Sequence, residues 1–326
     1  MKKVAITMGD PGGVGPEIIV KALSYAGIWD VCAPVIIGCR VPMEEAMAIL
    51  KSPLKLRIIK SPKESQPAPQ RGIIELIDLG IAKKFKKSKP TAEGGEAAVV
   101  CIKKAVELAL DRDVSGIVTA PISKRAVNMA GFKWPGHTEM LSELTHTKDY
   151  AMTFVGGPLR IVLVTTHTAL RKVPPLISAG RILKTIRLAK KACDMLGIKS
   201  PKIAVAGLNP HAGEVGLFGK EEIKKINPAV REALKEGIPV AGPFPPDVVF
   251  HKAYGGEFDL IVCMYHDQGL IPLKMIAFDK GVNMTVGLPF IRTSPDHGTA
   301  YDIAWKGIAN PSSMIEAIKL AAKLKM

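Results

Sequence analysis

The chain has 326 residues, 47% of them hydrophobic, and this length exceeds the usual size of a single core, so we expect two domains. Its formal net charge of +15 suggests nucleic acid, but the basic runs, such as the one at 83–89, carry no repeated motif, and we interpret them as a solvated lysine-rich surface rather than a nucleic-acid interface. Five cysteines without a CxxC pair favour a reducing cytoplasm over a disulfide framework, and the lack of any run of about 18 apolar residues predicts no membrane segment.

Apolar strand-like segments alternate with helix-like segments along the chain. In the first part the expected strands are 4–7, 33–38, 55–59, 73–79 and 116–120, with expected helices at 17–26, 42–51 and 92–111. In the second part the expected strands are 161–166, 202–207 and 260–264, with helices near 177–197 and 220–236. This alternation is typical of parallel sheets covered by helices and predicts an α/β fold.

A glycine-rich loop, MGDPGGVGPEI at 8–18, joins the first expected strand to the first expected helix. Pro16 suits the first turn of that helix. A dinucleotide fingerprint starting at Gly13 would need glycine at position 18, where Ile18 stands, and the lysine and hydroxyl pair of a Walker A loop is missing. We therefore interpret the loop as a structural turn that points Asp10 and Glu17 into a cleft.

Four of the seven histidines lie in polar, turn-like stretches, namely His137, His167, His211 and His266. The last three each follow an apolar strand. If the strands 161–166, 202–207 and 260–264 are neighbours in a parallel sheet, these three histidines meet at one edge of it. Neutral imidazoles there can hold a divalent ion and leave positions open for a substrate. For each histidine taken alone, the alternative is a hydrogen-bonded structural role.

The segment from Cys263 to Gly298 is dense in polar and charged side chains, set among glycines and prolines: His266, Asp267, Lys274, Asn283, Arg292, Asp296 and His297. It follows the carboxyl end of the expected strand 260–264, where ligands collect in open α/β sheets, so it reads as the wall of an active site. Lys274 and Arg292 suit phosphate and carboxylate groups; the alternative is a pair of surface cations in loops.

Two blocks at opposite ends of the chain, GDPGGVGPEI and HGTAYDIAWKGIANP, resemble blocks of the isopropylmalate and isocitrate dehydrogenases. The internal motifs TAPISK, PGHTEML, TTHTAL, GLNPHAGE and MYHDQGLIPLK resemble, over essentially the whole chain, the 4-hydroxythreonine-4-phosphate dehydrogenase family of pyridoxal phosphate synthesis. The resemblance implies an isopropylmalate-dehydrogenase-like fold of two α/β domains with an active-site cleft between them. One domain would comprise residues 1–134 and 287–326, and the other residues 135–286.

The same resemblance implies roles for particular residues. His167, His211 and His266 would bind a divalent ion: zinc, magnesium, manganese or cobalt. The substrate contacts would be His137, Thr138, Lys274, Asn283 and Arg292. In the wider superfamily the loop at His297, Gly298 and Thr299 holds the adenosine part of the cofactor, and the alternative for this loop is a plain helix cap. NAD is expected from the family, with NADP open because no acidic residue can be assigned to the ribose.

The implied reaction is the metal-dependent, NAD-linked oxidation of the C3 hydroxyl of 4-phosphooxy-L-threonine. The β-keto acid so formed would decarboxylate to 3-amino-2-oxopropyl phosphate, and the ion would assist both steps by lowering the pKa of the alcohol and stabilising the enolate. The general base stays open among Asp247, Asp267 and Lys274. A cytoplasmic homodimer whose active sites take residues from both subunits is also implied.

Three alternatives remain at this point. Paralogues of the family oxidise 4-phospho-D-threonate or 4-phospho-D-erythronate, which carry a hydroxyl at C2 in place of the amine; Glu93 and Glu96 are candidates for meeting C2, unless they only start a helix. A metal-dependent phosphohydrolase would also use three histidines, but it gives the 297–300 loop no role. A non-catalytic sensor of a phosphorylated metabolite gives no reason for three ligands.

Overall fold

The computed structural model describes residues 1–66 and 68–326 and divides into two compact units. The first unit consists of Met1–Thr147 and Leu288–Leu324, and the second of Lys148–Gly287 with Lys325–Met326. Residues 135–147, which the sequence assigned to the second domain, cluster with the first unit, because helix α5 (His137–Leu144) contacts helix α3 (Ala92–Leu110). His137 and Thr138 therefore belong to the first unit.

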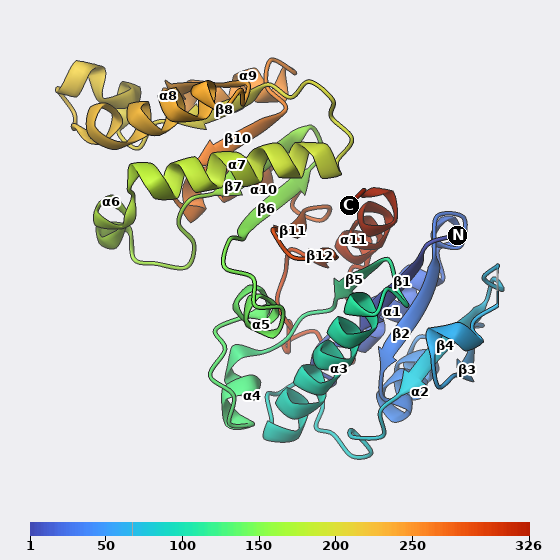
Figure 1. Ribbon diagram of the computed structural model, residues 1–326. Coiled ribbons are helices and arrows are strands. Elements are labelled where there is room, and N and C mark those ends of the chain that lie inside the picture. Colours follow the sequence, from blue (N-terminus) through green and yellow to red (C-terminus); the bar gives the residue numbers. More distant parts are fainter. Residues whose placement is uncertain (67) are drawn as a thin grey trace. The chain divides into compact units, whose positions relative to one another are not determined.

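A parallel sheet forms the centre of the first unit (Figure 1). Its spatial order is β3-β4-β2-β1-β5-β12. The strands are β1 (Lys3–Thr7), β2 (Ala33–Gly38), β3 (Lys55–Ile58), β4 (Ile73–Asp78), β5 (Gly116–Thr119) and β12 (Ile291–Pro295). β2 and β5 are buried at every position, as expected for parallel strands covered on both faces by helices. The five strands expected before residue 120 are all confirmed, whereas β12 was not foreseen.

The helices of this unit are α1 (Gly15–Leu23), α2 (Arg40–Ile49), α3, α4 (Lys124–Met129), α5 and α11 (Ser312–Lys323), with short 3-10 turns η1 (Ala26–Ile28) and η2 (Pro62–Glu64). α3 begins at Thr91, whose side-chain oxygen accepts a hydrogen bond from the Gly94 backbone N–H at 3.0 Å. Glu93 lies in the first turn of α3 and Glu96 further along it, so the helix-start interpretation of this segment holds.

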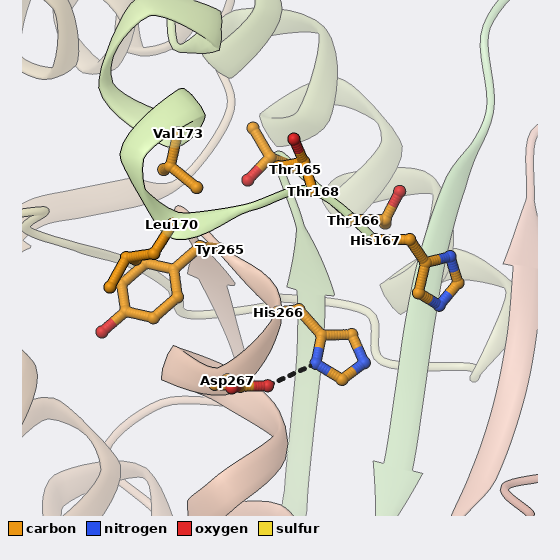
Figure 2. Close-up of a pocket in the computed structure, with 9 residues that line it drawn as sticks. All are labelled: Thr165, Thr166, His167, Thr168, Leu170, Val173, Tyr265, His266 and Asp267. Atoms are coloured by element: carbon orange, nitrogen blue, oxygen red, sulfur yellow. Dashed lines mark hydrogen bonds and ion pairs between the residues drawn. The ribbon is translucent and has the colours of Figure 1, made fainter.

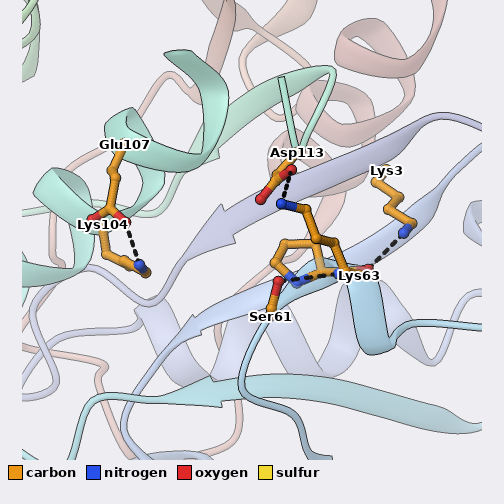
Figure 3. A network of polar contacts seen from close by, with 7 residues as sticks. Lys3, Ser61, Lys63, Lys104, Glu107 and Asp113 are labelled. Atoms are coloured by element: carbon orange, nitrogen blue, oxygen red, sulfur yellow. Dashed lines mark hydrogen bonds and ion pairs between the residues drawn. The ribbon is translucent and has the colours of Figure 1, made fainter. Parts of the chain in front are cut away.

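Polar contacts fasten the η2 turn to its surroundings (Figure 3). The Lys3 ammonium donates to the Pro62 carbonyl at 2.5 Å, and the Lys63 ammonium pairs with Asp113 at 3.3 Å. The Lys63 side chain is 76% exposed, so this ion pair contributes little to stability.

The second unit contains a mixed sheet in the order β11-β6-β7-β10-β8-β9 (Figure 1). Its strands are β6 (Ala151–Gly156), β7 (Leu159–Leu163), β8 (Ile203–Ala206), β9 (Val240–Phe244), β10 (Leu260–Cys263) and β11 (Val282–Val286). β6 pairs antiparallel with both β7 and β11, while β7, β10, β8 and β9 run parallel. The expected neighbours 161–166, 260–264 and 202–207 are thus confirmed, with β10 between β7 and β8.

The helical elements of the second unit are η3 (Leu170–Lys172), α6 (Val173–Leu176), α7 (Ala179–Met195), η4 (Pro210–Gly216), η5 (Glu222–Ile226), α8 (Asn227–Lys235), α9 (Pro246–Tyr254) and α10 (His266–Ala277). The helix expected at 220–236 is a π-helical turn, η5, that leads into α8 at Pro228, which lacks a backbone N–H. A core of apolar side chains from the strands and from α9 and α10 includes Phe154, Ile161, Ile261 and Leu273.

Two further expectations concern the chain as a whole. All five cysteines are buried free thiols. Within residues 1–66 and 68–326, no helix is long and apolar enough to cross a membrane.

Candidate metal and substrate site

The carboxyl ends of three adjacent strands carry the predicted ligand histidines. β7 and β10 pair through Ile161 and Ile261, and β10 and β8 pair through Leu260 and Ile203, so the three strands end at the same edge. His167 follows β7, His266 begins α10 directly after β10, and His211 lies in η4 after β8. The stretch after β10, where the sequence places polar side chains among glycines and prolines, is the helix α10, with Pro272 inside it.

His167 and His266 face one pocket of about 450 Å³ (Figure 2). It is lined by Thr165, Thr166, His167, Thr168, Leu170, Val173, Tyr265, His266 and Asp267. The two imidazole rings are 5.6 Å apart between centroids, with an interplanar angle of 41°. Metal–nitrogen bonds of about 2.0–2.1 Å in tetrahedral geometry place two imidazole centres about 5 Å apart. The spacing of this pair therefore fits a shared ion.

A carboxylate orients the His266 ring. Nδ1 of His266 lies 2.6 Å from Oδ1 of Asp267 (Figure 2). A neutral imidazole that donates from Nδ1 keeps the lone pair of Nε2 for a metal, which is the usual outer arrangement of histidine ligands. Nδ1 of His211 lies 3.2 Å from Oε2 of Glu214 in the same kind of contact. If both Nδ1 atoms donate, Nε2 is the nitrogen of each ring that keeps a lone pair.

His211 is not among the residues that line the pocket. In the part of the chain that the structure describes, no group of three or more His, Cys, Asp or Glu residues is arranged to hold a metal ion. The structure brings His167 and His266 together and leaves the third predicted ligand outside. His211, Ala212, Glu214 and Val215 have φ angles of 52°, 52°, 42° and 56°, a left-handed turn that costs non-glycine residues about 1–2 kcal/mol each.

In the first unit, three predicted substrate residues lie at the carboxyl end of β5 and on neighbouring segments. Arg292, on β12, is 2% exposed and donates from Nη2 to Oγ1 of Thr119 at 2.7 Å. Burial lowers the pKa of Arg292 to about 9, and the Glu139 carboxylate opposes this shift. The guanidinium is therefore a buried cation at neutral pH. Thr138 is also buried, at 4% exposure.

His137 begins α5, and its Nε2 atom is buried without a hydrogen-bond partner among the described residues. Desolvation lowers the pKa of His137 well below its usual value, and the positive charge of Arg292 lowers it further, while a backbone hydrogen bond at Ala120 opposes the shift. The ring is consequently neutral at physiological pH, with one buried nitrogen available to a ligand.

The other predicted substrate and catalytic residues belong to the second unit. Asn283, on β11, is 8% exposed, and its Oδ1 is buried with no partner in the described part of the chain. Lys274 lies on α10, where its ammonium is 5.8 Å from the Phe278 ring centre. Asp247 is exposed in the first turn of α9, and Asp267 is 70% exposed.

The loop at 297–307 is built of turns, so the alternative of a helix capped by His297 or Thr299 is wrong. His297 bonds through Nδ1 to the Gly298 carbonyl at 2.9 Å, and the Thr299 carbonyl accepts from the Val14 backbone N–H at 3.0 Å. A side chain at Gly13 would place its Cβ 2.9 Å from Thr299. The glycine-rich loop therefore packs closely against the loop expected to hold the cofactor.

Two buried carboxylates, from Asp10 and Glu17, also join the N-terminal region to the 301–307 turns. Asp10 accepts from the Tyr301 hydroxyl at 2.6 Å, and Glu17 accepts from the backbone N–H groups of Trp305 and Gly307 at 2.5 and 2.6 Å. The expectation that Asp10 and Glu17 point into a cleft is wrong, because they are 1% and 0% exposed and bind the C-terminal loop. Burial raises the pKa of Asp10, against the lowering effect of its hydrogen bonds with Tyr301 and Gly12.

Two buried polar residues next to the predicted ligands are not apparent from the sequence pattern. Thr165 and Gln268 are 1% and 7% exposed and lie two positions from His167 and His266. The signal that could have revealed them is a hydrogen-bonding side chain two positions from a predicted ligand histidine, at the point where a buried strand ends.

The chain is similar to known proteins over almost its whole length. The family model described as pyridoxal phosphate biosynthetic protein PdxA matches residues 30–321. The chain is 50% identical to the D-threonate 4-phosphate dehydrogenase of Salmonella typhimurium over 99% of both proteins. It is 48% identical to the 4-hydroxythreonine-4-phosphate dehydrogenase of Trichlorobacter lovleyi, over 99% of this chain and 97% of that one. The solved structure of a 4-hydroxythreonine-4-phosphate dehydrogenase from Klebsiella pneumoniae matches with a TM-score of 0.91 at 44% identity, covering 99% of this chain and 97% of that one.

Proposed function

Because the chain belongs to the family of the pyridoxal phosphate biosynthetic protein PdxA, we propose that it is a metal-dependent, NAD-linked dehydrogenase that oxidises the C3 hydroxyl of 4-phosphooxy-L-threonine. The hydride from C3 reduces NAD⁺, and the hydroxyl proton passes to a base. The β-keto acid then loses carbon dioxide to give 3-amino-2-oxopropyl phosphate. The observation that carries this proposal is the His167–His266 pair, 5.6 Å apart at the ends of two adjacent parallel strands.

His167 and His266 are the proposed ligands of the divalent ion, and His211 is the proposed third. A bound zinc, manganese, cobalt or magnesium ion supplies Lewis-acid polarisation of the substrate oxygen. Imidazole ligands favour the first-row metals over magnesium. The contact between His266 and Asp267 at 2.6 Å gives Asp267 an orienting role, which weakens its candidacy as the general base and leaves Asp247 and Lys274.

Two of the predicted substrate contacts are cations. We propose that Arg292 and Lys274 bind the phosphate and carboxylate, since both are cations and Arg292 is held in place by Thr119. His137 and Asn283 each have a buried atom without a partner in the described residues, Nε2 and Oδ1, which suits hydrogen bonds to a bound hydroxyl or phosphate. Thr138 is the remaining proposed contact.

The proposed cofactor site is the loop at His297, Gly298 and Thr299, with NAD favoured over NADP from the family alone. This loop is supported by the glycine-rich loop through Val14 and by the Asp10–Tyr301 hydrogen bond. Five buried free thiols are consistent with a reducing cytoplasm as the working compartment.

We propose a homodimer that forms through α10. Ile271, Met275 and Phe278 are 60%, 83% and 74% exposed and recur at the spacing of one helical face. A cluster of large exposed apolar side chains is typical of a protein interface. Lys274 lies on the same helix, so a partner that covers this face would bring a second copy close to that cation.

4-Phospho-D-threonate is the second candidate substrate, because the relative that is 50% identical is a D-threonate 4-phosphate dehydrogenase. The two substrates share the carboxylate, the C3 hydroxyl and the phosphate, and they differ at C2. A phosphohydrolase is disfavoured, since both sequence relatives compared above are dehydrogenases by name.

One assay separates these functions. The protein is mixed with cobalt or zinc, NAD⁺ and either substrate, and NADH absorbance and inorganic phosphate are followed together. We expect NADH to appear with higher kcat/KM for phosphooxy-L-threonine. A preference for the threonate beyond about tenfold, or about 1.4 kcal/mol, would reverse the choice of substrate. Phosphate release without NADH would contradict the dehydrogenase.

A further inference from the structure

Buried polar contacts connect the three strand ends that carry the predicted ligands. Oγ1 and the backbone N–H of Thr165, after β7, donate to the Met264 carbonyl at 2.7 and 3.2 Å. Gln268 continues the chain of contacts: its Oε1 accepts from the Met264 N–H at 2.6 Å, and its Nε2 donates to the Gly207 carbonyl at 2.7 Å. Gln268 therefore ties the end of β10 to the end of β8. We call Thr165, Gln268 and Glu222 the strand-end belt.

Glu222 closes the belt on the side of His211. One carboxylate oxygen accepts from the backbone N–H groups of Leu208 and Asn209, both at 2.8 Å, and the other accepts from the Asn209 side-chain amide at 2.9 Å. Glu222 is 2% exposed and starts the π-helical turn η5. It fixes the backbone that leads from β8 to His211.

The belt acts mainly on the backbone beside each histidine rather than on the imidazoles. Thr165 precedes His167 by two positions, Gln268 follows His266 by two, and Asn209 precedes His211 by two. Because these contacts are buried, loss of one partner leaves a backbone group unsatisfied, at a cost of about 1–3 kcal/mol. After such a loss, we expect the loop that carries the unsatisfied group to shift toward another hydrogen-bond partner. A shift of one loop would change the spacing between the histidines.

We propose that Gln268 is a positioning residue for the metal site, which, with Thr165 and Glu222, sets the distances between the three histidine-bearing loops. Gln268 is the member that contacts two strand ends through its side chain alone, since it bonds Met264 and Gly207 with its two amide atoms. Its loss is expected to reduce metal affinity more than substrate affinity. This inference rests on the proposed function, because it requires a metal at the histidines.

The test is a cobalt titration of the metal-free, full-length protein by calorimetry and by the visible spectrum of bound cobalt. Gln268→Met keeps the length of the side chain and removes both hydrogen bonds. We expect cobalt to bind about 10–100-fold more weakly, with an altered spectrum, because outer-shell partners of metal ligands have effects of this size. At saturating cobalt, KM for the phosphorylated substrate should stay within about threefold of wild type, since the site is then refilled.

Asp259→Ala is the matched control. Asp259 accepts from the Lys202 backbone N–H at 2.8 Å and so links the same two strands, β10 and β8, at their amino ends. Its replacement should lower the melting temperature without weakening cobalt binding. This bond lies at the ends of the strands that carry no histidine. The control therefore distinguishes a loss of metal affinity caused by displaced histidines from one caused by a general loss of stability.

The outcomes distinguish failure of the proposed metal site from failure of the strand-end belt. A wild-type protein that binds no cobalt would overturn both the metal site and the belt. If wild type binds cobalt and His266→Ala does not, but Gln268→Met binds as tightly as wild type, the belt alone is refuted. Where Gln268→Met does not fold, Thr165→Val replaces it: cobalt affinity at least about fivefold lower supports the belt, and unchanged affinity refutes it.

Discussion

His266 and Asp267 are consecutive residues with different tasks in the proposed site. The imidazole faces the pocket beside His167, while the carboxylate holds Nδ1 at 2.6 Å and is itself 70% exposed. A carboxylate that is already in contact with an imidazole nitrogen suits an orienting residue. The two roles predict different effects of substitution.

For this pair we predict that Asp267→Ala weakens cobalt binding about tenfold, because the His266 ring loses the contact that fixes its orientation. His266→Ala should remove most of the metal and most of the activity. Asp247→Ala, an exposed carboxylate on α9, is the control and should bind cobalt as wild type does. An Asp267→Ala enzyme with normal metal affinity but little remaining activity would instead support Asp267 as the general base.

His137 links burial to pH dependence in the first unit. Its pKa is well below the usual value of about 6.5, because of desolvation and the nearby Arg292 charge. As the pH falls through about 6.5, the unfolded chain takes up a proton at this histidine while the folded protein does not. A lowered histidine pKa therefore gives stability that is present above about pH 6.5 and is lost progressively as the pH falls toward the folded pKa.

We predict that wild type loses more free energy of unfolding between pH 7.5 and pH 5.5 than His137→Gln does, by at most about 1.4 kcal/mol per pH unit. Urea unfolding at the two pH values measures this difference. His146→Gln, at an exposed histidine of the same unit, is the control substitution. Equal slopes for His137→Gln and wild type would show that His137 titrates normally in the folded protein.

At the scale of elements, the ends of the chain are joined through buried carboxylates rather than through a helix cap. Asp10 and Glu17, on the first loop and helix, bind the backbone and side chains of the 301–307 turns. The close packing of Gly13 against Thr299 leaves no room for a side chain there. Loss of a contact in this region should therefore be felt at the proposed cofactor loop and not at the histidines.

Tyr301→Phe tests that separation. The substitution removes the hydrogen bond to Asp10, leaves a buried carboxyl group with less support, and should cost about 1–3 kcal/mol of stability. We predict a KM for NAD raised several-fold, with cobalt affinity unchanged. Tyr254→Phe, which alters a tyrosine that is 55% exposed, is the control for both measurements. A normal KM for NAD in a destabilised Tyr301→Phe enzyme would restrict this bond to folding.

How far the sequence predicts the fold depends on what each element buries. Apart from Thr119, the runs 33–38, 116–120 and 260–264 are apolar, because helices cover both faces of a parallel sheet, and all three contain strands. β12, with sequence IRTSP, is equally buried but mixed in composition, so apolar periodicity does not reveal it. No helix was predicted over α10, which contains Gly269 and Pro272; it is helical, and Leu270 and Leu273 on it belong to the apolar core beside the sheet.

The same limit applies to the site. The adjacency of β7, β10 and β8, and with it the pairing of His167 with His266, follows from parallel strands whose carboxyl ends carry histidines. The position of His211 does not follow, because it depends on a left-handed turn that no local pattern announces. The hydrogen bonds of the strand-end belt could not be predicted from the sequence either, because Gln268 is separated by 61 positions from the Gly207 carbonyl that it binds.

At the scale of the whole molecule, the exposed face of α10 predicts that assembly and activity are lost together. Met275 is 83% exposed and has Lys274 as its neighbour in sequence. We predict that Met275→Glu gives a monomer by light scattering, because a charge on this face must lose its water when a second copy covers it. Met129→Glu, at an exposed methionine of the first unit, is the control and should leave the dimer intact. A dimeric Met275→Glu protein would place the interface elsewhere.

The assembled enzyme then permits a test of shared sites. If Lys274 serves the metal site of the partner, His266→Ala and Lys274→Ala subunits are each inactive alone, whereas a heterodimer contains one site in which both residues are intact. We predict that purified heterodimers, made with two affinity tags, regain up to about half of the wild-type activity, since one of two equivalent sites is complete. Separate active sites within each subunit predict no recovery, because every subunit then carries one of the two defects. The comparison is made at saturating cobalt, so that partial metal loss in the His266→Ala subunit does not imitate a failure of complementation.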